Sequence, residues 1–386
     1  MWETLPYRHE PTSVIQCQAK RAARFAFACW SKAREALDAV GRWPRACACV
    51  ARFGRFCSAE LKITVVTPHS RQLCSGRIPG FVAGHYRFDE CVILLEKLLA
   101  ECGARLIQSS AVSMDANART VTFANGDILT FDCVSLNTGP VMDRQRIESQ
   151  MPGASEHALF VGPIESFAQL WLRVLDKAKG QKIHFSVVEA GAGGLELAMA
   201  AAYALSGPAC VAGSRVTLVT GGQVPGAAYP VATQRRITKA LDRLQIEVLL
   251  DTCAGMGSGH IRRATGAHLV CDLPMLAVGA QAPAWLGSSG LDLDTQGFAQ
   301  VNAFQQSTSH AAVFAVGDVA SRVDAPHARS GVYAVRAGPP LLANLLSALN
   351  GQPLAAYQPQ KRTLHLLLCG GKQAIAAWGG FSVQGD

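Results

Sequence analysis

The sequence lacks the cysteine spacings on which redox dithiols and zinc ribbons depend. It has 13 cysteines, yet none stands in a Cys-x-x-Cys or Cys-x-x-x-x-Cys pair, and Cys47 and Cys49 are only one residue apart. These spacings therefore spell out neither kind of site. No secretory signal is evident either, so we expect mostly buried, reduced thiols in an intracellular protein.

Two further features are missing. No apolar run reaches the roughly 18 residues that a membrane-spanning helix needs, so we expect a soluble or peripheral protein without a transmembrane segment. The sequence also suggests no Ser-His-Asp grouping and no carboxylate dyad, and no metal site is expected. His69, His85 and His327 are scattered, and we expect them at turns or in solvent.

Charge is sparse and unevenly distributed. Apolar residues make up 49% of the chain and charged residues 17%, which is typical of globular proteins. Residues 1–60 carry ten Lys and Arg against five Asp and Glu, so they supply +5 of the net charge of +8. The rest of the chain is only mildly basic, and we therefore expect no nucleic-acid partner.

A buried strand is predicted over Ala311–Val316, and it ends abruptly at Gly317 and Asp318. Open α/β sheets bind ligands at the carboxyl ends of their strands. A carboxylate there can accept hydrogen bonds from a polyol such as the ribityl chain of a flavin. The alternative is that Asp318 closes a turn or caps a short helix.

A second signature lies in the middle of the chain. Ile183–Val188 is predicted to be a strand and Leu195–Leu205 a helix, with Gly191, Gly193 and Gly194 in the turn between them. A pyrophosphate binds at the N-terminus of a helix in such a unit.

Three segments resemble a known family. Val313–Ala320 is similar to the second flavin motif of the pyridine nucleotide-disulfide oxidoreductase superfamily, in its type II NADH dehydrogenase-like branch. Gly331–Pro340 and Arg77–Glu90 resemble the subgroup found N-terminal to selenide, water dikinase. The resemblance runs from Leu61 to the C-terminus and does not cover the first sixty residues.

The resemblance implies an α/β fold with two Rossmann-like dinucleotide-binding domains, the NAD(P) domain inserted in the FAD domain. The expected order is an atypical N-terminal segment, the first half of the FAD domain, the NAD(P) domain, the second half of the FAD domain and a C-terminal tail. The corresponding boundaries are residues 1–60, 61–140, 141–270, 271–350 and 351–386.

The resemblance also implies site residues. Those expected at FAD are Thr138, Gly139, Gly279, Gly317 and Asp318, and those at NAD(P)H are Gly191, Gly193, Gly194 and Glu196. Glu196 corresponds to a glutamate that often approaches the nicotinamide, and its alternative role is a charge near the helix start. Glu165 is a minor catalytic candidate facing the flavin and acceptor; complementing its helix dipole is the alternative.

The sequence departs from the family pattern in two places. The first sixty residues contain no Gly-x-Gly-x-x-Gly, although a helix over Ser31–Val40 is expected and Ala48–Phe56 could end the helix that follows this motif. This segment is either an organelle-targeting segment or a divergent start, and we favour the second. Glu189 replaces the first glycine of the second motif, where its side chain strains the turn and its charge lies near the phosphates.

The predicted function is a cytoplasmic FAD-dependent NAD(P)H oxidoreductase that passes electrons to a quinone or another small acceptor without a dithiol. A homodimer and organelle targeting by residues 1–60 stay open. The main alternative is a flavoprotein-fold remnant with weak or no FAD binding. A peripheral membrane or nucleic-acid binder acting through the basic N-terminal segment is a third hypothesis.

Other elements follow from local patterns. A small antiparallel layer should form from 104–107, 112–114, 120–123 and 128–134, Leu269–Val278 should be one crossing strand, and the tail should hold two strands, 363–369 and 373–378. Helices are expected over 87–101, 164–179 and 236–244, with a strand at 246–250.

Overall fold

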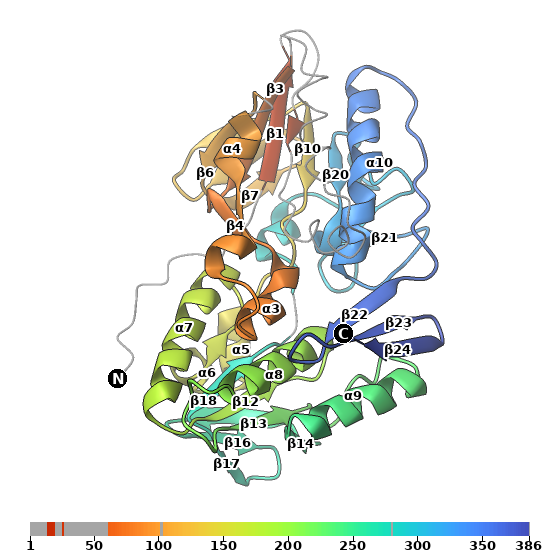
Figure 1. The fold of residues 1–386 in the computed structure, drawn as a ribbon. Coiled ribbons are helices and arrows are strands. Elements are labelled where there is room, and N and C mark those ends of the chain that lie inside the picture. The colour runs from red at the N-terminus through yellow and green to blue at the C-terminus, as the bar shows by residue number, and fades with distance from the viewer. Residues whose placement is uncertain (1–13, 20–24, 27–60, 101–102, 279–280, 386) are drawn as a thin grey trace. The chain divides into compact units, whose positions relative to one another are not determined.

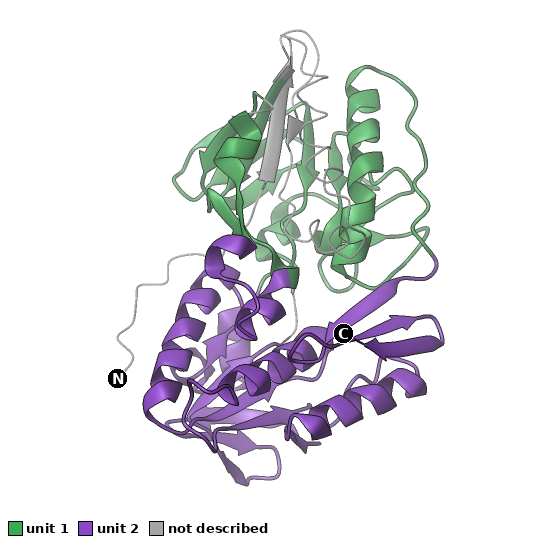
Figure 2. Cartoon of the chain, viewed as in Figure 1, with its two compact units in different colours: residues 1–76, 92–141, 280–360 green, residues 77–91, 142–279, 361–386 purple. Residues whose placement is uncertain are grey.

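A computed structural model describes residues 14–19, 25–26, 61–100, 103–278 and 281–385. The helix expected over 31–40, the segment 48–56 and the site candidate Gly279 lie outside these residues. The chain divides into two compact units (Figure 2). Unit 1 comprises residues 1–76, 92–141 and 280–360, and unit 2 comprises residues 77–91, 142–279 and 361–386.

Unit 1 is built on a six-stranded sheet in the order β20-β10-β1-β2-β3-β6 (Figure 1). Its strands are Val313–Ala315, Cys133–Leu136, Val14–Ala19, Phe25–Ala26, Leu61–Thr67 and Arg105–Gln108. The neighbouring pairs β10–β20, β2–β3 and β3–β6 are parallel. β1 runs antiparallel to both β10 and β3, so its carboxyl end lies at the opposite sheet edge from theirs.

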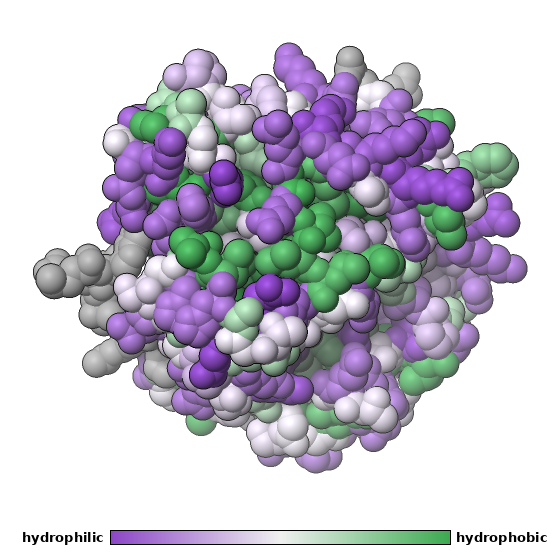
Figure 3. Space-filling view, turned by 90° about the horizontal axis from the view of Figure 1, so that it is seen from below, coloured by the Kyte–Doolittle hydropathy of each residue, from purple (hydrophilic) through white to green (hydrophobic). Residues whose placement is uncertain are grey.

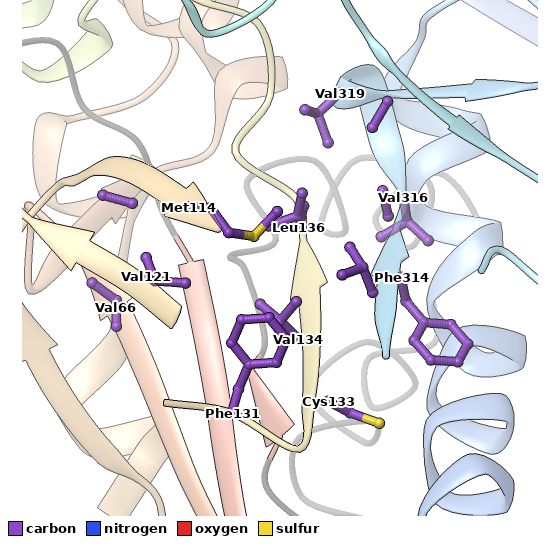
Figure 4. Close-up of a cluster of buried hydrophobic side chains, with 14 of the residues drawn as sticks. Val66, Met114, Val121, Phe131, Cys133, Val134, Leu136, Phe314, Val316 and Val319 are labelled. Atoms are coloured by element: carbon purple, nitrogen blue, oxygen red, sulfur yellow. The ribbon is translucent and has the colours of Figure 1, made fainter. Parts of the chain in front are cut away.

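The core of unit 1 explains which residues form these strands. Val134 and Leu136 of β10 and Phe314 of β20 are fully buried and lie in one apolar cluster (Figure 4). Leu341 and Leu345 of the helix α10 (Gly331–Leu349) belong to the same cluster. The apolar runs recognised in the sequence are therefore the strands that α10 packs against.

The antiparallel layer is smaller than expected. β7, β8 and β9 (Ala111–Asp115, Thr120–Phe123 and Ile128–Thr130) form it, with Gly126 at a φ of 87° in the turn between β8 and β9. The prediction was wrong for β6 and for residues 133–134, which belong to the main sheet. Parallel pairing with β3 and β20 outweighs the local hairpin pattern there.

The helix predicted over 87–101 was also largely wrong. A 3-10 turn, Phe88–Cys91, is followed by the strand β5 (Val92–Leu94), which pairs with β4 (Arg71–Leu73), and only α4 (Leu95–Ala100) is helical. Leu94 is 52% exposed because the strand turns it away from the face that Leu95 and Leu99 bury.

Unit 2 contains an all-parallel sheet in the order β11-β18-β12-β13-β14. Its strands are Leu159–Phe160, Leu273–Leu276, His184–Val188, Arg215–Val219 and Glu247–Leu249, and its longer helices are α7, α8 and α9, at Ile164–Gly180, Ala192–Leu205 and Val231–Arg243. The helices predicted over 164–179, 195–205 and 236–244 and the strands predicted over 183–188 and 246–250 are confirmed apart from their ends. Short helices α3, α5 and α6 span Ile78–Val82, Arg144–Gln150 and Ala154–His157.

The single strand expected over Leu269–Val278 is two strands in two sheets. β17 (His268–Val270) closes an antiparallel sheet with β15 (Cys253–Gly257) and β16 (His260–Arg263), and β18 enters the parallel sheet. Cys271 and Asp272 separate them, and Asp272 accepts a hydrogen bond from the His184 backbone nitrogen at 2.7 Å. That bond fixes the point at which the chain changes sheet.

The C-terminal tail forms three strands rather than two. β22, β23 and β24 (Leu364–Leu368, Ala374–Trp378 and Phe381–Gly385) make an antiparallel sheet within unit 2.

None of the helices in the described ranges has the length and apolar character needed to cross a bilayer. Apolar residues also reach the surface of the molecule, and a view from below shows them gathered between hydrophilic ones (Figure 3).

Candidate functional site

The turn after β12 in unit 2 has the geometry of a dinucleotide-binding turn. β12 ends at Val188 in the middle of the parallel sheet, and α8 begins at Ala192 with Gly191 as its N-cap. Gly191 and Gly193 are exposed. The N-terminus of this 14-residue helix is therefore open to solvent at the two glycines, and a helix N-terminus favours an anion such as a pyrophosphate.

Gly194 is required by packing. A Cβ at Gly194 would lie well under 3.0 Å from the carbonyl oxygen of Glu189 and 3.6 Å from the Cβ of Ala277. Among the described residues, no atom lies within 4 Å of where a Cβ at Gly193 would be. The three glycines thus have different tasks, and Gly194 is the one that lets α8 approach the sheet.

Glu189 adopts the backbone conformation of the glycine it replaces. Its φ is 92°, a region that costs a non-glycine residue free energy. Its carboxylate lies near the turn, because a Cβ at Gly191 would be 3.7 Å from its Oε1. The strain expected from the sequence is therefore present, and the negative charge lies beside the exposed helix start.

Glu196 has a structural partner that the sequence did not suggest. Its Oε1 accepts a hydrogen bond from the Leu368 backbone nitrogen at 2.9 Å, which ties α8 to β22. Burial raises the pKa of nearby Tyr229 to about 12, and the charge of Glu196 adds to this effect. The Tyr229 ring meets the His365 ring edge to face at 5.7 Å. Of Glu196, Tyr229 and His365, only Glu196 was identified from a sequence motif.

The site residues of unit 1 follow two neighbouring parallel strands. Thr138 and Gly139 come after β10, and Gly317 and Asp318 come after β20, so all four lie at one edge of the sheet. Gly317 has a φ of 70°, and a Cβ there would be 2.5 Å from Oδ1 of Asn137. A glycine at position 317 therefore lets the two strand ends approach each other.

Asp318 lies in a 3-10 turn, Gly317–Val319, and also lines a pocket. A turn position was the alternative role that the sequence left open for Asp318. In this turn Asp318 still lies at the carboxyl end of β20, where a ligand is expected. The pocket measures about 360 Å³ including its open mouth and lies between this turn, β21 (Ala320–Arg322) and the first half of α10.

Four buried polar atoms of the pocket-lining residues have no hydrogen-bond partner within the described part of the chain. They are Oε1 of Gln305, Nη1 of Arg322, Oγ of Ser330 and the hydroxyl of Tyr357. The Gln305 side chain is held by a 2.7 Å bond from its Nε2 to the Ala337 carbonyl, which leaves Oε1 as an acceptor. Buried polar atoms require partners. A ligand rich in hydroxyl and carbonyl groups would supply them.

Arg322 has its charge balanced. Its Nε and Nη2 donate to Asp324 at 2.9 and 2.8 Å, Nη2 also donates to the Tyr357 carbonyl at 3.0 Å, and the side chain is 4% exposed. The hydrogen bond from Arg322 lowers the pKa of Asp324. No local pattern signals this group in the sequence, since Gln305, Arg322 and Tyr357 are far apart in the chain.

Glu165 lies elsewhere, in the first turn of α7 in unit 2, where it is half-buried. This position fits the helix-dipole role as well as any role in catalysis. The four candidates at NAD(P)H belong to unit 2 together with Glu165, whereas Thr138, Gly139, Gly317 and Asp318 belong to unit 1.

A family model described as pyridine nucleotide-disulphide oxidoreductase matches residues 46–338. The chain belongs to this family. Its members are FAD-dependent oxidoreductases that use a pyridine nucleotide, and the chain is accordingly an FAD-dependent NAD(P)H oxidoreductase in class.

Solved structures agree on the fold. The sulfide:quinone oxidoreductase of Aquifex aeolicus is 16% identical, with a TM-score of 0.72, over 88% of this chain and 85% of that one. NDH2 of Plasmodium falciparum, in complex with NADH, is 12% identical, with a TM-score of 0.67, over 84% and 86%. A ferredoxin reductase of Rhodopseudomonas palustris is 18% identical, with a TM-score of 0.69, over 86% and 79%.

The two cofactors of this oxidoreductase family fit the described residues unequally. The turn Glu189–Gly194 fits NAD(P)H, and the Asp318 edge with its unpaired polar atoms fits the ribityl and ring end of FAD. No glycine-rich turn leads from a sheet strand into a helix at the Asp318 edge within the described residues of unit 1. The antiparallel β1 cannot deliver such a turn there, because its carboxyl end is at the other edge.

Proposed function

We propose that unit 1 binds FAD and unit 2 binds NAD(P)H, and that the reduced flavin passes its electrons to a quinone or another small acceptor. Bound FAD would supply the hydride-accepting chemistry. The residues of the chain bind and orient the two nucleotides. The observation that carries this proposal is that each unit has a candidate site at the end of a buried strand. Asp318 follows β20 in unit 1, and Gly191 follows β12 in unit 2.

The cysteines support transfer without a dithiol. None of the cysteines whose burial the structure describes forms a disulfide, and all of these but Cys210 are buried. Burial raises the pKa of Cys133, Cys271 and Cys369 to about 11, so these groups stay protonated thiols at neutral pH. Thiolates are the reactive form in dithiol exchange. An acceptor that meets the flavin directly is the simpler route.

A quinone is the preferred acceptor because the name of the Aquifex aeolicus relative specifies one. The test is anaerobic. The purified chain is loaded with FAD, reduced with NADH or NADPH, and mixed with a short-chain quinone while flavin absorbance is followed. Reoxidation by the quinone at a rate that matches steady-state turnover supports the proposal. Reoxidation by oxygen or ferricyanide alone would remove the quinone from it.

The contributions of the candidate residues can be separated. In the proposal Glu196 approaches the nicotinamide and Glu165 the acceptor. Glu165→Gln should then slow quinone-dependent reoxidation and leave reduction by NADH unchanged. Equal effects on both half-reactions would assign Glu165 to the helix dipole of α7 instead.

The second candidate function is a scaffold that keeps the fold but binds FAD poorly. Two observations favour it, the φ of 92° at Glu189 and the absence of a glycine triplet in residues 1–60. It predicts a colourless protein that takes up no FAD when the nucleotide is added in excess.

A further inference from the structure

The strand β13 of unit 2 ends without a carboxylate. In dinucleotide-binding folds an acid at the end of the second strand bonds the ribose 2′-hydroxyl of NADH, whereas an arginine nearby accommodates the 2′-phosphate of NADPH. β13 is the second strand of this unit's motif, beside β12, and it ends at Val219. Thr220 comes next, and the first acid after it in the chain is Asp242. The side chain that would select NADH is therefore missing from the strand end.

The turn after β13 is open. Gly221 and Gly222 are exposed and have φ angles of 68° and 82°. Among the described residues, no atom lies within 4 Å of where a Cβ at either glycine would be. The strand end therefore has room beside it for a group larger than a hydroxyl, such as a phosphate.

The neighbouring strand connects this turn to a cation. β14 ends at Leu249, and Asp251 lies two residues further on, where its backbone carbonyl accepts a hydrogen bond from the Gly221 backbone nitrogen at 3.0 Å. The Asp251 carboxylate accepts a hydrogen bond from Nε of Arg263 at 2.7 Å. Because β13 and β14 are parallel, Gly221 and Asp251 both lie at the carboxyl edge of the sheet. Asp251 thus holds Arg263 one residue away from the turn.

The charge of Asp251 is taken up by its own partners. Oδ1 accepts from the Thr252 backbone nitrogen at 2.7 Å, and Oδ2 accepts from the Thr265 hydroxyl at 3.2 Å as well as from Arg263. The bond from Thr252 and those from Arg263 and Thr265 lower the pKa of Asp251. Asp251 is also buried, so little of its negative charge faces a ligand.

Arg263 keeps hydrogen-bond donors for a ligand. Its side chain is 28% exposed, and within the part of the chain that the structure describes only its Nε donates a hydrogen bond. The two Nη groups stay available. A guanidinium binds a phosphate through two parallel N–H···O bonds. The edge of the sheet where the adenosine ribose is expected therefore offers a phosphate both space and a cation.

We propose that unit 2 prefers NADPH to NADH and that Arg263 determines this preference by binding the 2′-phosphate. The inference rests on the proposed function, in which unit 2 binds NAD(P)H. Glu189 does not enter the choice, because its carboxylate lies beside the turn that precedes α8, where the pyrophosphate is expected. Both coenzymes carry that pyrophosphate, so the charge of Glu189 affects them alike.

The test measures the binding of the oxidised coenzymes NADP⁺ and NAD⁺ to the full chain, so no hydride is transferred. Isothermal titration calorimetry gives each dissociation constant. NADP⁺ should bind about 10- to 100-fold more tightly than NAD⁺, as expected for a charged hydrogen bond. Arg263→Gln should remove most of this difference and leave the affinity for NAD⁺ unchanged, whereas Arg263→Lys, which keeps the charge, should lose less. Salt should weaken the binding of NADP⁺ more than that of NAD⁺.

Gly221→Asp tests the same choice by adding a carboxylate. Aspartate tolerates a left-handed φ, and its charge would repel a 2′-phosphate and bond a 2′-hydroxyl, so NAD⁺ should then bind more tightly than NADP⁺. Gly259→Asp is the matched control, because it adds the same charge at an exposed glycine with a φ of 77° between β15 and β16. Arg215→Gln removes an exposed cation at the other end of β13. Both controls should bind the two coenzymes like the wild type.

Two results would overturn the preference and leave coenzyme binding by unit 2 intact. In the first, the wild type binds NAD⁺ as tightly as NADP⁺ or more tightly. In the second, Arg263→Gln weakens both coenzymes equally, which would make Arg263 a structural partner of Asp251. Binding of neither coenzyme would refute the proposed function as well, so the two failures can be told apart. Circular dichroism checks that each variant folds, and the Arg263 variants decide the matter if Gly221→Asp unfolds.

Discussion

The carbonyl oxygen of Glu189 lies where the side chain of any residue larger than glycine at position 194 would have to lie. This relationship joins the end of β12 to the first turn of α8. It explains why position 194 retains the glycine of the motif although position 189 carries glutamate in place of glycine. The close approach of α8 to the end of β12 therefore depends on a backbone contact.

Gly194→Ala should destabilise the protein by about 3 kcal/mol, because a Cβ must displace the Glu189 carbonyl or the whole helix. Gly193→Ala is the matched control, since its Cβ meets no atom within 4 Å and alanine favours a helix. Chemical denaturation of both variants measures the difference. Equal stability would mean that α8 does not approach β12 as closely as described.

Glu189→Gly should raise the free energy of unfolding by about 1 kcal/mol, because glycine adopts a φ of 92° without strain. It should also tighten NADH binding, since one negative charge is removed beside the helix start. Gln245→Gly relieves a φ of 54° in the same unit and is the control. Titration with NADH should separate the two variants, and unchanged affinity in Glu189→Gly would refute the charge effect.

Asp318→Asn should weaken FAD binding by about 10- to 100-fold, because a charged hydrogen-bond acceptor contributes about 1.5–3 kcal/mol. The retained flavin absorbance after gel filtration measures the loss. Asp127→Asn, at the exposed β8–β9 hairpin, removes the same charge away from the pocket. Flavin retention that falls equally in both variants would count against a role for Asp318.

The pair Arg322–Asp324 predicts a pH dependence. The hydrogen bond from Arg322 lowers the pKa of Asp324 in the folded state, so this carboxylate stabilises the fold above its unfolded pKa of about 3.9. The contribution is lost as the pH falls through the lowered folded value. The stability difference between wild type and Asp324→Asn should therefore be constant near neutral pH and shrink below about pH 4. Melting temperatures across this range test it, and a constant difference would contradict the pair.

Much of the fold could be predicted because its main strands and helices are formed by runs of buried apolar residues. The strands ending at Val188 and Ala315 and the helix after Gly191 follow from apolar periodicity and glycine placement. Residues 88–94 could not be predicted in the same way. Their spacing suits a helix, but pairing with β4, which is a tertiary effect, decides their conformation.

The candidate site was predictable only where a motif is local. Gly191, Gly194, Gly317 and Asp318 lie in continuous segments whose strand-turn patterns reveal them. The pocket group Gln305, Arg322 and Tyr357 comes from three segments, and folding alone brings it together.

The most direct measurement is the absorbance spectrum of the purified chain after FAD is added and unbound FAD is removed, followed by anaerobic addition of NADH or NADPH. The account predicts a yellow protein with bound flavin that loses its colour when the nicotinamide nucleotide is added. A colourless protein, or a yellow one that neither nucleotide bleaches, would contradict it.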